Sequence, residues 1–247
     1  MPETVTLRID PGRAKDGSPE SFEPLEFRSG EVVALVGPTG SGKTRLLADV
    51  ERLTTGDSPT ARRVTLTGAP EGVVESGFAV ARITQSMQFF LDLTAGEFVD
   101  LHARARGREG GVGVEVIQWA NRLAGEPFDA AQPLASLSGG QTRALMVADV
   151  VLVSDAPVLL IDEIENAGID RHAALDFLIR KGRLVFVATH DPLIALRARC
   201  RLVLAGGAIR QVRPTSAAER RLVVSLSTMD RKLSALRDRL RRGEGLR

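Results

Sequence analysis

The stretch that decides the fold reads GEVVALVGPTGSGKT and spans residues 30–44. Its apolar run from Val32 to Val36 lies between Gly30 and a glycine-rich segment that starts at Gly37. Such a run is typical of a strand that is buried on both faces of a parallel sheet. The next segment, RLLADVERL, repeats leucine and valine at helical spacing. The predicted order is strand, glycine loop, helix, which indicates an α/β fold.

The glycine-rich segment carries a phosphate-binding pattern. It matches G-x-x-x-x-G-K-[ST] in full, with the strand before it and the helix after it that this motif requires. Glycines let backbone N–H groups turn toward a phosphate, and a helix N-terminus adds the positive end of its dipole. We predict that Lys43 binds the β- and γ-phosphates and that Thr44 gives Mg²⁺ a hydroxyl ligand. The eight predicted nucleotide-binding residues are Gly37, Pro38, Thr39, Gly40, Ser41, Gly42, Lys43 and Thr44.

Two further buried-strand patterns end in polar residues. PVLLI at 157–161 is followed by Asp162 and Glu163, and LVFVA at 184–188 is followed by Thr189, His190 and Asp191. Functional side chains collect at the carboxyl ends of parallel strands, so we expect both endings to lie beside the glycine loop. Neighbouring carboxylates suit two tasks there: Asp162 holds hydrated Mg²⁺, and Glu163 polarises the attacking water as general base.

A second anion-binding pattern is LSGGQ at residues 137–141. Ser138, Gly139 and Gly140 offer a hydroxyl and bare backbone N–H groups at the start of the apolar segment TRALMVADVVL. By itself the pattern also fits an ordinary helix cap. With the glycine loop at 37–44 and the acidic strand end at 158–163, however, the chain resembles an ATP-binding cassette (ABC) ATPase. The resemblance extends to about residue 213.

The resemblance implies a P-loop NTPase (RecA-like) core and assigns roles to three more residues. Gln85 matches the glutamine that contacts Mg²⁺ and water in this family. His190 matches the switch histidine that contacts the γ-phosphate, and Asp170 matches an aspartate at the dimer interface. The catalytic residues that we expect are therefore Glu163, His190 and Gln85, and the cofactors are ATP and Mg²⁺.

The family also implies a dimer of cassettes, either identical or different. Two cassettes close head to tail, so Ser138, Gly140 and Gln141 of one chain would complete the ATP site that Lys43 builds in the other. If the two phosphate-binding patterns lie on opposite faces of one chain, a single ATP cannot use both of them. The modest length of 247 residues thus predicts a dimer.

Three features depart from the family pattern. Residues 11–18 lack the aromatic residue on which the family stacks adenine, so Arg13 or Phe22 contacts the base or the contact is weaker. The segment from Glu163 to Asp170 is one residue longer than usual. Asp149 stands about where transporter subunits usually carry an arginine.

The rest of the chain divides by its patterns. Residues 1–85 and 138–213 are predicted to form the core, with the β-prone pieces of 57–84 in an antiparallel side sheet. Residues 86–137 read as a helical subdomain with helices near 95–106 and 114–124. Residues 214–247 are predicted to hold an amphipathic helix, and we expect its apolar stripe to face the core, although a dimerising or partner-binding helix is the alternative. The stripe follows a heptad: Leu222, Leu226, Met229, Leu233, Leu236 and Leu240.

Composition narrows the class of protein. The chain is 43% hydrophobic and 26% charged, which excludes collagenous and disordered chains, and Cys200 has no second cysteine with which to pair. The net charge of +2 predicts no nucleic-acid partner. Charges interrupt the first ten residues, and Asp149 and Asp155 interrupt the most apolar stretch. We therefore expect a cytoplasmic chain that reaches the inner face of a membrane only through a partner.

Two functions fit these motifs. The first is a cassette subunit that dimerises on ATP and powers a separate membrane permease, with SMQFFLDL at 86–93 forming a docking groove and Phe89 and Phe90 as its anchors. The second is a soluble ABC ATPase that remodels or activates a protein or metalloenzyme complex. A DNA-repair cassette is excluded because the interval from Thr44 to Ser138 is too short for a long coiled coil.

Overall fold

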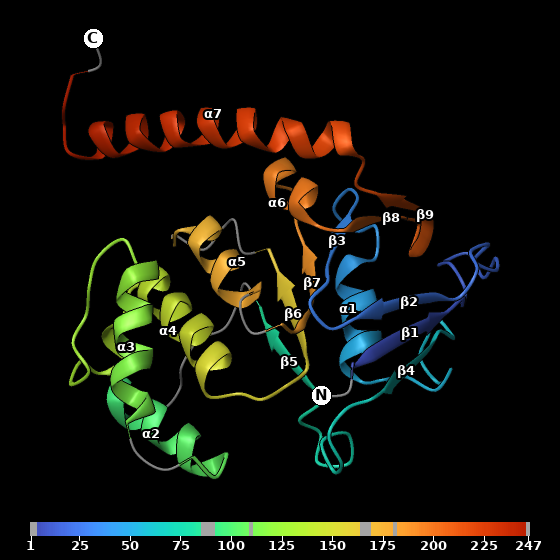
Figure 1. The fold of residues 1–247 in the computed structure, drawn as a ribbon, viewed down its shortest axis with the longest axis horizontal. Helices are drawn as coiled ribbons and strands as arrows, with labels where there is room; N and C mark the ends of the chain where they lie inside the picture. Colours follow the sequence, from blue (N-terminus) through green and yellow to red (C-terminus); the bar gives the residue numbers. More distant parts are fainter. Residues whose placement is uncertain (1–3, 85–91, 109–110, 164–168, 180–181, 246–247) are drawn as a thin grey trace.

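The computed structural model describes residues 4–84, 92–108, 111–163, 169–179 and 182–245. Its centre is a six-stranded sheet in the order β5-β6-β7-β3-β8-β9 (Figure 1). Neighbouring strands are parallel except β8 and β9, which run antiparallel. The strands are β3 (Val32–Val36), β5 (Val80–Ile83), β6 (Val158–Asp162), β7 (Leu184–Ala188), β8 (Cys200–Ala205) and β9 (Ala208–Pro214).

A second sheet is antiparallel and has the order β2-β1-β4, with β1 (Thr6–Asp10), β2 (Leu25–Arg28) and β4 (Arg63–Thr67). The prediction of an antiparallel side sheet is right for β4 but wrong for β5, because β5 pairs in parallel with β6 in the central sheet. β5 has only four residues. A pattern of that length does not indicate which strand it pairs with.

Alternation along the central strands places helices on both faces of the sheet. Val33 and Leu35 face a buried cluster that contains α1 and the second sheet, and the Phe27 and Phe186 rings meet there edge to face at 5.3 Å. Ala34 faces the opposite cluster, which is built from α2 to α6. The helices are α1 (Lys43–Glu51), α2 (Ala95–Ala105), α3 (Val112–Leu123), α4 (Gly139–Leu152), α5 (Arg171–Ile179), α6 (Pro192–Arg197) and α7 (Ala217–Arg241), with a 3₁₀ turn at Leu134–Ser136.

The region between β5 and α4 is helical, as predicted. α2 and α3 lie close to the expected helices, with α3 packed against α4 and α2 packed against α3 (Figure 1). Thr94 begins α2 with a capping box, in which its side chain accepts from the backbone N–H of Glu97 and the Glu97 carboxylate accepts from the backbone N–H of Thr94. The division at 86–137 stays a prediction.

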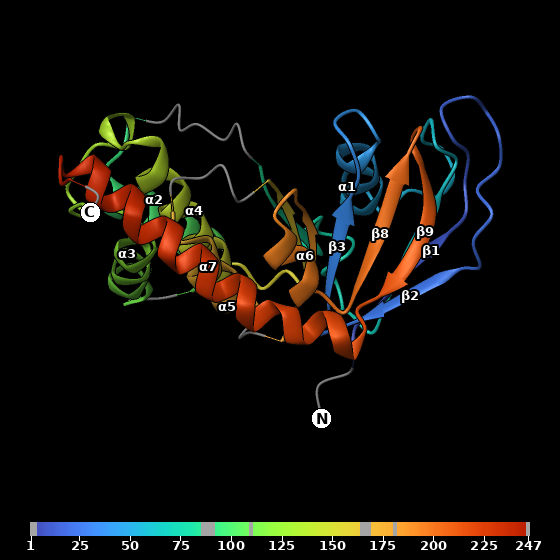
Figure 2. The ribbon, with the colours of Figure 1, turned by 90° about the horizontal axis from the view of Figure 1, so that it is seen from above.

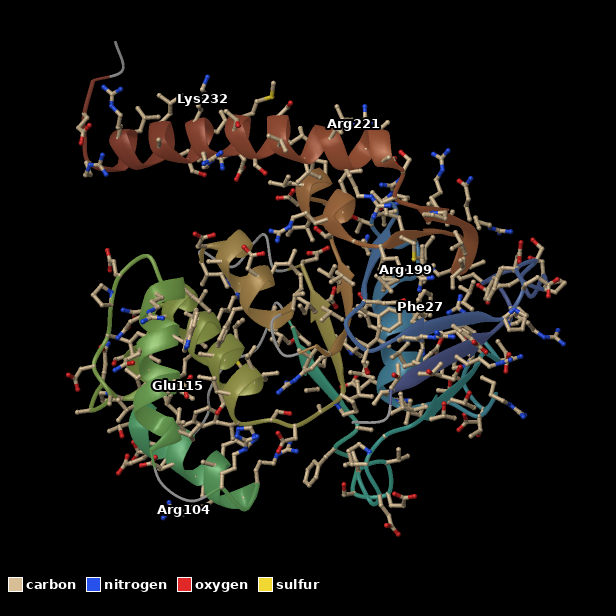
Figure 3. All side chains as sticks on the ribbon, in the orientation of Figure 1. Phe27, Arg104, Glu115, Arg199, Arg221 and Lys232 are labelled. Carbon is tan, nitrogen blue, oxygen red and sulfur yellow. The ribbon has the colours of Figure 1, made fainter. Side chains whose placement is uncertain are left out.

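The C-terminal helix α7 crosses α6 and continues past α5 toward α3 (Figure 2). The expectation that its apolar stripe faces the core is wrong: Leu222, Met229 and Leu240 are 54%, 61% and 58% exposed. α7 turns a different side toward α6, where Val223 is half-buried, and the Arg201–Glu219 ion pair joins the start of the helix to β8. The basic side chains Arg221 and Lys232 lie at the outer edge of the molecule, whereas Phe27 is interior (Figure 3).

Across the described parts of the chain, no helix combines the length and the apolar character that a membrane span needs.

Candidate functional site

The ends of three neighbouring strands bring the predicted site residues to one edge of the sheet. Ala188, at the end of β7, is the cross-strand partner of Asp162 on β6 and of Leu35 on β3. The glycine loop follows β3, Glu163 follows β6, and His190 follows β7 by two residues. The prediction that these endings lie side by side is confirmed.

The glycine loop closes around the Lys43 ammonium group. Nζ of Lys43 donates to the carbonyl oxygens of Gly37 at 2.8 Å and Pro38 at 3.2 Å. The hydroxyl of Ser41 is buried and has no hydrogen-bond partner among the described residues. A buried donor without a partner is costly, so its presence beside the loop indicates a site for an acceptor such as a phosphate oxygen.

Helix α1 begins with no side-chain cap. Gly42, its N-cap, has φ 109°, a left-handed conformation that glycine adopts without steric cost. The first N–H groups of the helix therefore point toward the loop without a side chain to accept from them. Gly37 is also required, because a Cβ there would lie 2.3 Å from the carbonyl oxygen of Leu204. This open N-terminus is suited to bind an anion.

Glu163 and His190 form a pair beside the loop. Nε2 of His190 lies 3.3 Å from Oε1 of Glu163, and both side chains are partly exposed. The backbone N–H of Glu163 donates to the carbonyl oxygen of Ala188 at 3.0 Å. With φ +54°, Glu163 adopts a left-handed conformation that is uncommon for residues other than glycine and often marks a functional position. A hollow of about 350 Å³ lies between the loop and His190, and Gly37, Pro38 and His190 are among the residues that line it.

Asp162, the predicted Mg²⁺ ligand, is paired with an arginine that the sequence reasoning did not identify. Nη2 of Arg82, on β5, lies 3.2 Å from Oδ2 of Asp162. Nη1 of the same guanidinium lies 2.8 Å from Oε2 of Glu51 on α1. A charged residue inside the apolar segment AVARI was the available signal. The prediction that β5 belongs to the second sheet placed Arg82 away from β6. The sequence reasoning therefore did not connect Arg82 with Asp162.

The LSGGQ segment begins α4 with a complete capping box. The hydroxyl of Ser138 accepts from the backbone N–H of Gln141 at 3.3 Å, and Oε1 of Gln141 accepts from the backbone N–H of Ser138 at 2.9 Å. The Gln141 amide also donates to the carbonyl oxygens of Glu126 and Pro127. α4 packs on the face of the sheet opposite to α1, so the two helix N-termini do not share a face.

A family model described as ABC transporter matches residues 24–166. The chain belongs to the ABC transporter family. It is an ATP-binding cassette and an ATP hydrolase, as the resemblance of its motifs implied. The α/β P-loop NTPase fold, predicted from residues 30–44, is confirmed as well.

Known proteins support this assignment over most of the cassette. An uncharacterised ABC transporter ATP-binding protein of Methanocaldococcus jannaschii is 42% identical and covers 99% of this chain and 95% of its own. An ATP-dependent lipid A-core flippase of Ralstonia nicotianae is 32% identical over 76% of this chain, which spans about one third (33%) of the flippase. A solved ATP-binding cassette, dimeric in a post-hydrolysis state with ADP and Pi, shares the fold. Its TM-score is 0.60 at 24% identity, with 86% of this chain and 99% of that chain covered.

The loop at 11–20, where the family holds adenine, contacts the glycine loop through a lysine. Nζ of Lys15 donates to the carbonyl oxygen of Gly40 at 2.9 Å, a contact that the sequence reasoning missed. Of the two residues proposed to contact the base, Arg13 is exposed, whereas Phe22 packs against the buried cluster around α1. Part of the Phe22 side chain therefore packs in the interior of the cassette.

A fully buried ion cluster fixes that loop against α1. Nη2 of Arg62 lies 2.7 Å from Oε1 of Glu20, and Nη1 of Arg62 lies 3.0 Å from Oδ2 of Asp49. Glu20 also accepts from the backbone N–H of Gly12 at 2.9 Å. Breaking a buried pair of this kind leaves an uncompensated charge, so the cluster holds residues 12–20 in one position.

Of the remaining predicted residues, the structure shows contacts for some and does not describe the others. Asp149 on α4 pairs with His102 on α2, with Oδ2 2.7 Å from Nδ1, so its partner is a histidine of the helical region. Asp170 caps α5, and its backbone N–H donates to the carbonyl oxygen of Leu123. Gln85 and the expected anchors Phe89 and Phe90 lie outside the described residues.

Proposed function

We propose that this cassette hydrolyses Mg²⁺·ATP between two head-to-tail copies and thereby powers a membrane transporter. The observation that carries the proposal is the Glu163–His190 pair at 3.3 Å beside an uncapped, glycine-lined helix N-terminus. Together these supply a phosphate cradle, a carboxylate base and a group that can contact the γ-phosphate.

The residues of the glycine loop suit the polyphosphate. Gly37, Gly40 and Gly42 have left-handed backbones that leave N–H groups free to turn inward, and Lys43 is the point charge for the β- and γ-phosphates. Lys43 gives up its two carbonyl partners, at 2.8 and 3.2 Å, when phosphate oxygens replace them. The orphaned hydroxyl of Ser41 gains an acceptor in the same step.

Thr44 and Asp162 suit Mg²⁺, because the ion prefers hard oxygen ligands and usually takes one or two protein oxygens together with substrate phosphates. We assign Gln85 to the same ion from the family pattern. When bound, Mg²⁺ neutralises charge on the β- and γ-phosphate oxygens. Thr44 is exposed at the start of α1, so its hydroxyl is open to solvent and to a ligand.

Glu163 is the proposed general base. Its carboxylate accepts a proton from the attacking water, and His190 holds Glu163 in position and contacts the γ-phosphate. The left-handed backbone of Glu163 directs its side chain from the end of β6 toward the loop after β7. Attack in line with the leaving oxygen needs this alignment of water and phosphate.

The dimer follows from where the two helix N-termini lie. Because α1 and α4 pack on opposite faces of the sheet, we propose that Ser138, Gly139, Gly140 and Gln141 act on the ATP of a second copy, with Asp170 at the interface. The solved relative is a dimer, which supports the same arrangement. The second cassette is an identical chain or a different one.

A complementation experiment tests this arrangement. Lys43→Ala and Ser138→Arg are each expected to abolish hydrolysis alone. In a mixed dimer, one site joins the intact loop of the Ser138→Arg chain to the intact LSGGQ of the Lys43→Ala chain. Mixing the two inactive proteins should therefore restore part of the ATPase rate. If each chain used its own LSGGQ, mixing would restore nothing.

We propose that the partner is a separate permease that docks on the segment 86–93. We also propose that the chain divides into a core of 1–85 and 138–213 and a helical subdomain of 86–137. The cassette would then lie on the inner face of the membrane. Affinity capture with the ATP-trapped Glu163→Gln variant from membrane and soluble fractions tests this. A polytopic membrane protein supports transport, whereas a soluble protein or metalloenzyme complex favours the remodelling function.

A further inference from the structure

Arg82 joins two acidic residues at the base of the predicted metal site. It lies near the end of β5, three residues before Gln85 in the sequence. Its Nη2 is 3.2 Å from Asp162 Oδ2, and its Nη1 is 2.8 Å from Glu51 Oε2. Its third nitrogen, Nε, is buried without a hydrogen-bond partner in the part of the chain that the structure describes. Among the described residues, two ion pairs hold the guanidinium.

The pair with Asp162 is shielded, whereas the pair with Glu51 is not. The side chains of Arg82 and Asp162 are 16% and 15% exposed, and that of Glu51 is 41% exposed. Shielding from water strengthens the attraction between opposite charges. Arg82 thus cancels much of the negative charge of Asp162 in the metal-free protein.

This neutralisation has opposite effects on two ligands. A bare carboxylate near the glycine loop would repel the phosphates of metal-free ATP, so Arg82 favours their approach. The same guanidinium opposes a divalent cation at Asp162, because like charges repel. In the metal-free protein, Arg82 therefore supplies the positive charge that a divalent cation would supply beside Asp162.

We propose that Arg82 is a placeholder cation: it neutralises Asp162 while the metal is absent, and it keeps only Glu51 as its partner once Mg²⁺ is bound. This inference rests on the proposed function of Asp162 as a metal ligand. Glu51 already contacts the other end of the guanidinium, so Arg82 can release Asp162 without leaving its strand. Arg82 sets how much Mg²⁺ the cassette needs to bind ATP.

The placement of Arg82 on β5 also links the metal site to the segment that follows β5 in the sequence, on which we propose that the permease docks. β5 is paired with β6 from Val80 to Ile83, and Gln85 follows two residues later. A partner that pulls on the segment after β5 would change the distance between Arg82 and Asp162. Partner docking and Mg²⁺ affinity are therefore expected to change together.

The test is the Mg²⁺ concentration at half-maximal ATP binding, measured by titration calorimetry, with ATP affinity in EDTA as a second readout. Arg82→Met should lower the Mg²⁺ midpoint about fivefold and weaken metal-free ATP binding by about the same factor, the size of one partly exposed charge pair. Glu51→Gln is the matched variant, and it should shift the Mg²⁺ midpoint in the opposite direction. It leaves Asp162 as the one acidic partner of Arg82 among the described residues, so the Mg²⁺ midpoint should rise. Arg82→Lys keeps the charge and should stay near the wild-type midpoint.

The proposal is overturned if Arg82→Met leaves the midpoint unchanged or raises it, because the ion pair would then be structural or would orient Asp162 for the metal. If Arg82→Met does not fold, Glu51→Gln decides by the sign of its shift. Asp162→Asn distinguishes a failure of the proposed metal site from a failure of the proposed role of Arg82. If it keeps the wild-type Mg²⁺ response, the assignment of Asp162 fails and this inference fails with it. If it loses that response while Arg82→Met does not shift the midpoint, only the role of Arg82 fails.

Discussion

Two helix N-termini in this cassette carry sequences that are predicted to bind phosphate, yet the two helix starts are built differently. α1 starts at Gly42 with no side-chain cap, and an orphaned Ser41 hydroxyl lies beside it. α4 starts at Ser138 with a complete capping box. Among the described residues, no side chain caps the N–H groups of the first N-terminus, whereas the Ser138 side chain caps the second. α1 is thus prepared to bind ATP in a single chain, whereas α4 is stable without it.

The difference between the two helix starts bears on the proposed dimer. A capped helix start gains less from an anion than an open one, because a side-chain oxygen already satisfies one of its donors. The Ser138 cap stabilises the start of α4 in the single chain. In the proposed dimer, ATP of the second copy would compete for the same hydroxyl and N–H groups. We therefore expect sequential use of the two sites, with α1 first.

The largest effect is expected at the step that needs both N-termini. Glu163→Gln removes the general base and should lower the ATPase rate about 10³-fold. ATP should then hold two chains together, and backbone amides 139–141 should gain protection from hydrogen exchange. Glu75→Gln is the matched control, because Glu75 is an exposed carboxylate that precedes β5, whereas the site residues follow the carboxyl ends of the parallel strands. A wild-type rate in Glu163→Gln would refute the base assignment.

The next effect separates α1 from α4. Lys43→Ala removes a charge-assisted contact worth about 2–3 kcal/mol, so ATP affinity of the single chain should fall roughly 30- to 150-fold. Ser138→Ala should leave that affinity unchanged, because α4 does not contact ATP in its own chain. Equilibrium binding at concentrations below dimerisation measures both values. Undiminished affinity in Lys43→Ala would contradict the phosphate role of the loop.

A smaller effect compares two capping boxes within the molecule. Ser138→Ala and Thr94→Ala each remove a cap and should each lower the free energy of unfolding by about 1 kcal/mol. Only Ser138→Ala should also lower the ATPase rate, since the α2 cap has no proposed contact with ATP. Denaturant unfolding and ATPase assays on the same preparations check this. Equal loss of activity in both variants would mean that Ser138 acts through stability alone.

The smallest effect is a difference in pH response between the same two caps. Hydrogen bonds from the Thr94 backbone and hydroxyl hold the pKa of Glu97 below its ordinary value of 4.5. The contribution of this cap is therefore complete above that value and is lost as pH falls through the lowered pKa. The α4 cap uses Gln141, which does not titrate. Hydrogen exchange in acid should rise first in the first turn of α2, and Glu97→Gln should remove the difference from α4.

Local patterns determined the parts of this site that follow one another along the chain. The strand, glycine loop and helix of residues 30–51 are encoded within about 20 residues, because glycines, apolar runs and helical spacing act over short distances. Asp162 and Glu163 at a strand end, and LSGGQ at a helix start, are determined in the same way. The family, the ATPase activity and the α/β fold could all be derived from these segments.

Contacts between distant residues were decided only by the tertiary structure. Arg82 meets Asp162 across 80 positions, and Arg62 meets the carbonyl oxygen of Gly207 across 145. β5 joined the central sheet against the prediction, and α7 turned its heptad stripe outward. No local pattern specifies such pairings, because they depend on which faces the whole chain buries together. The sequence thus determined the phosphate chemistry, and the packing of the chain placed an arginine beside its predicted metal ligand.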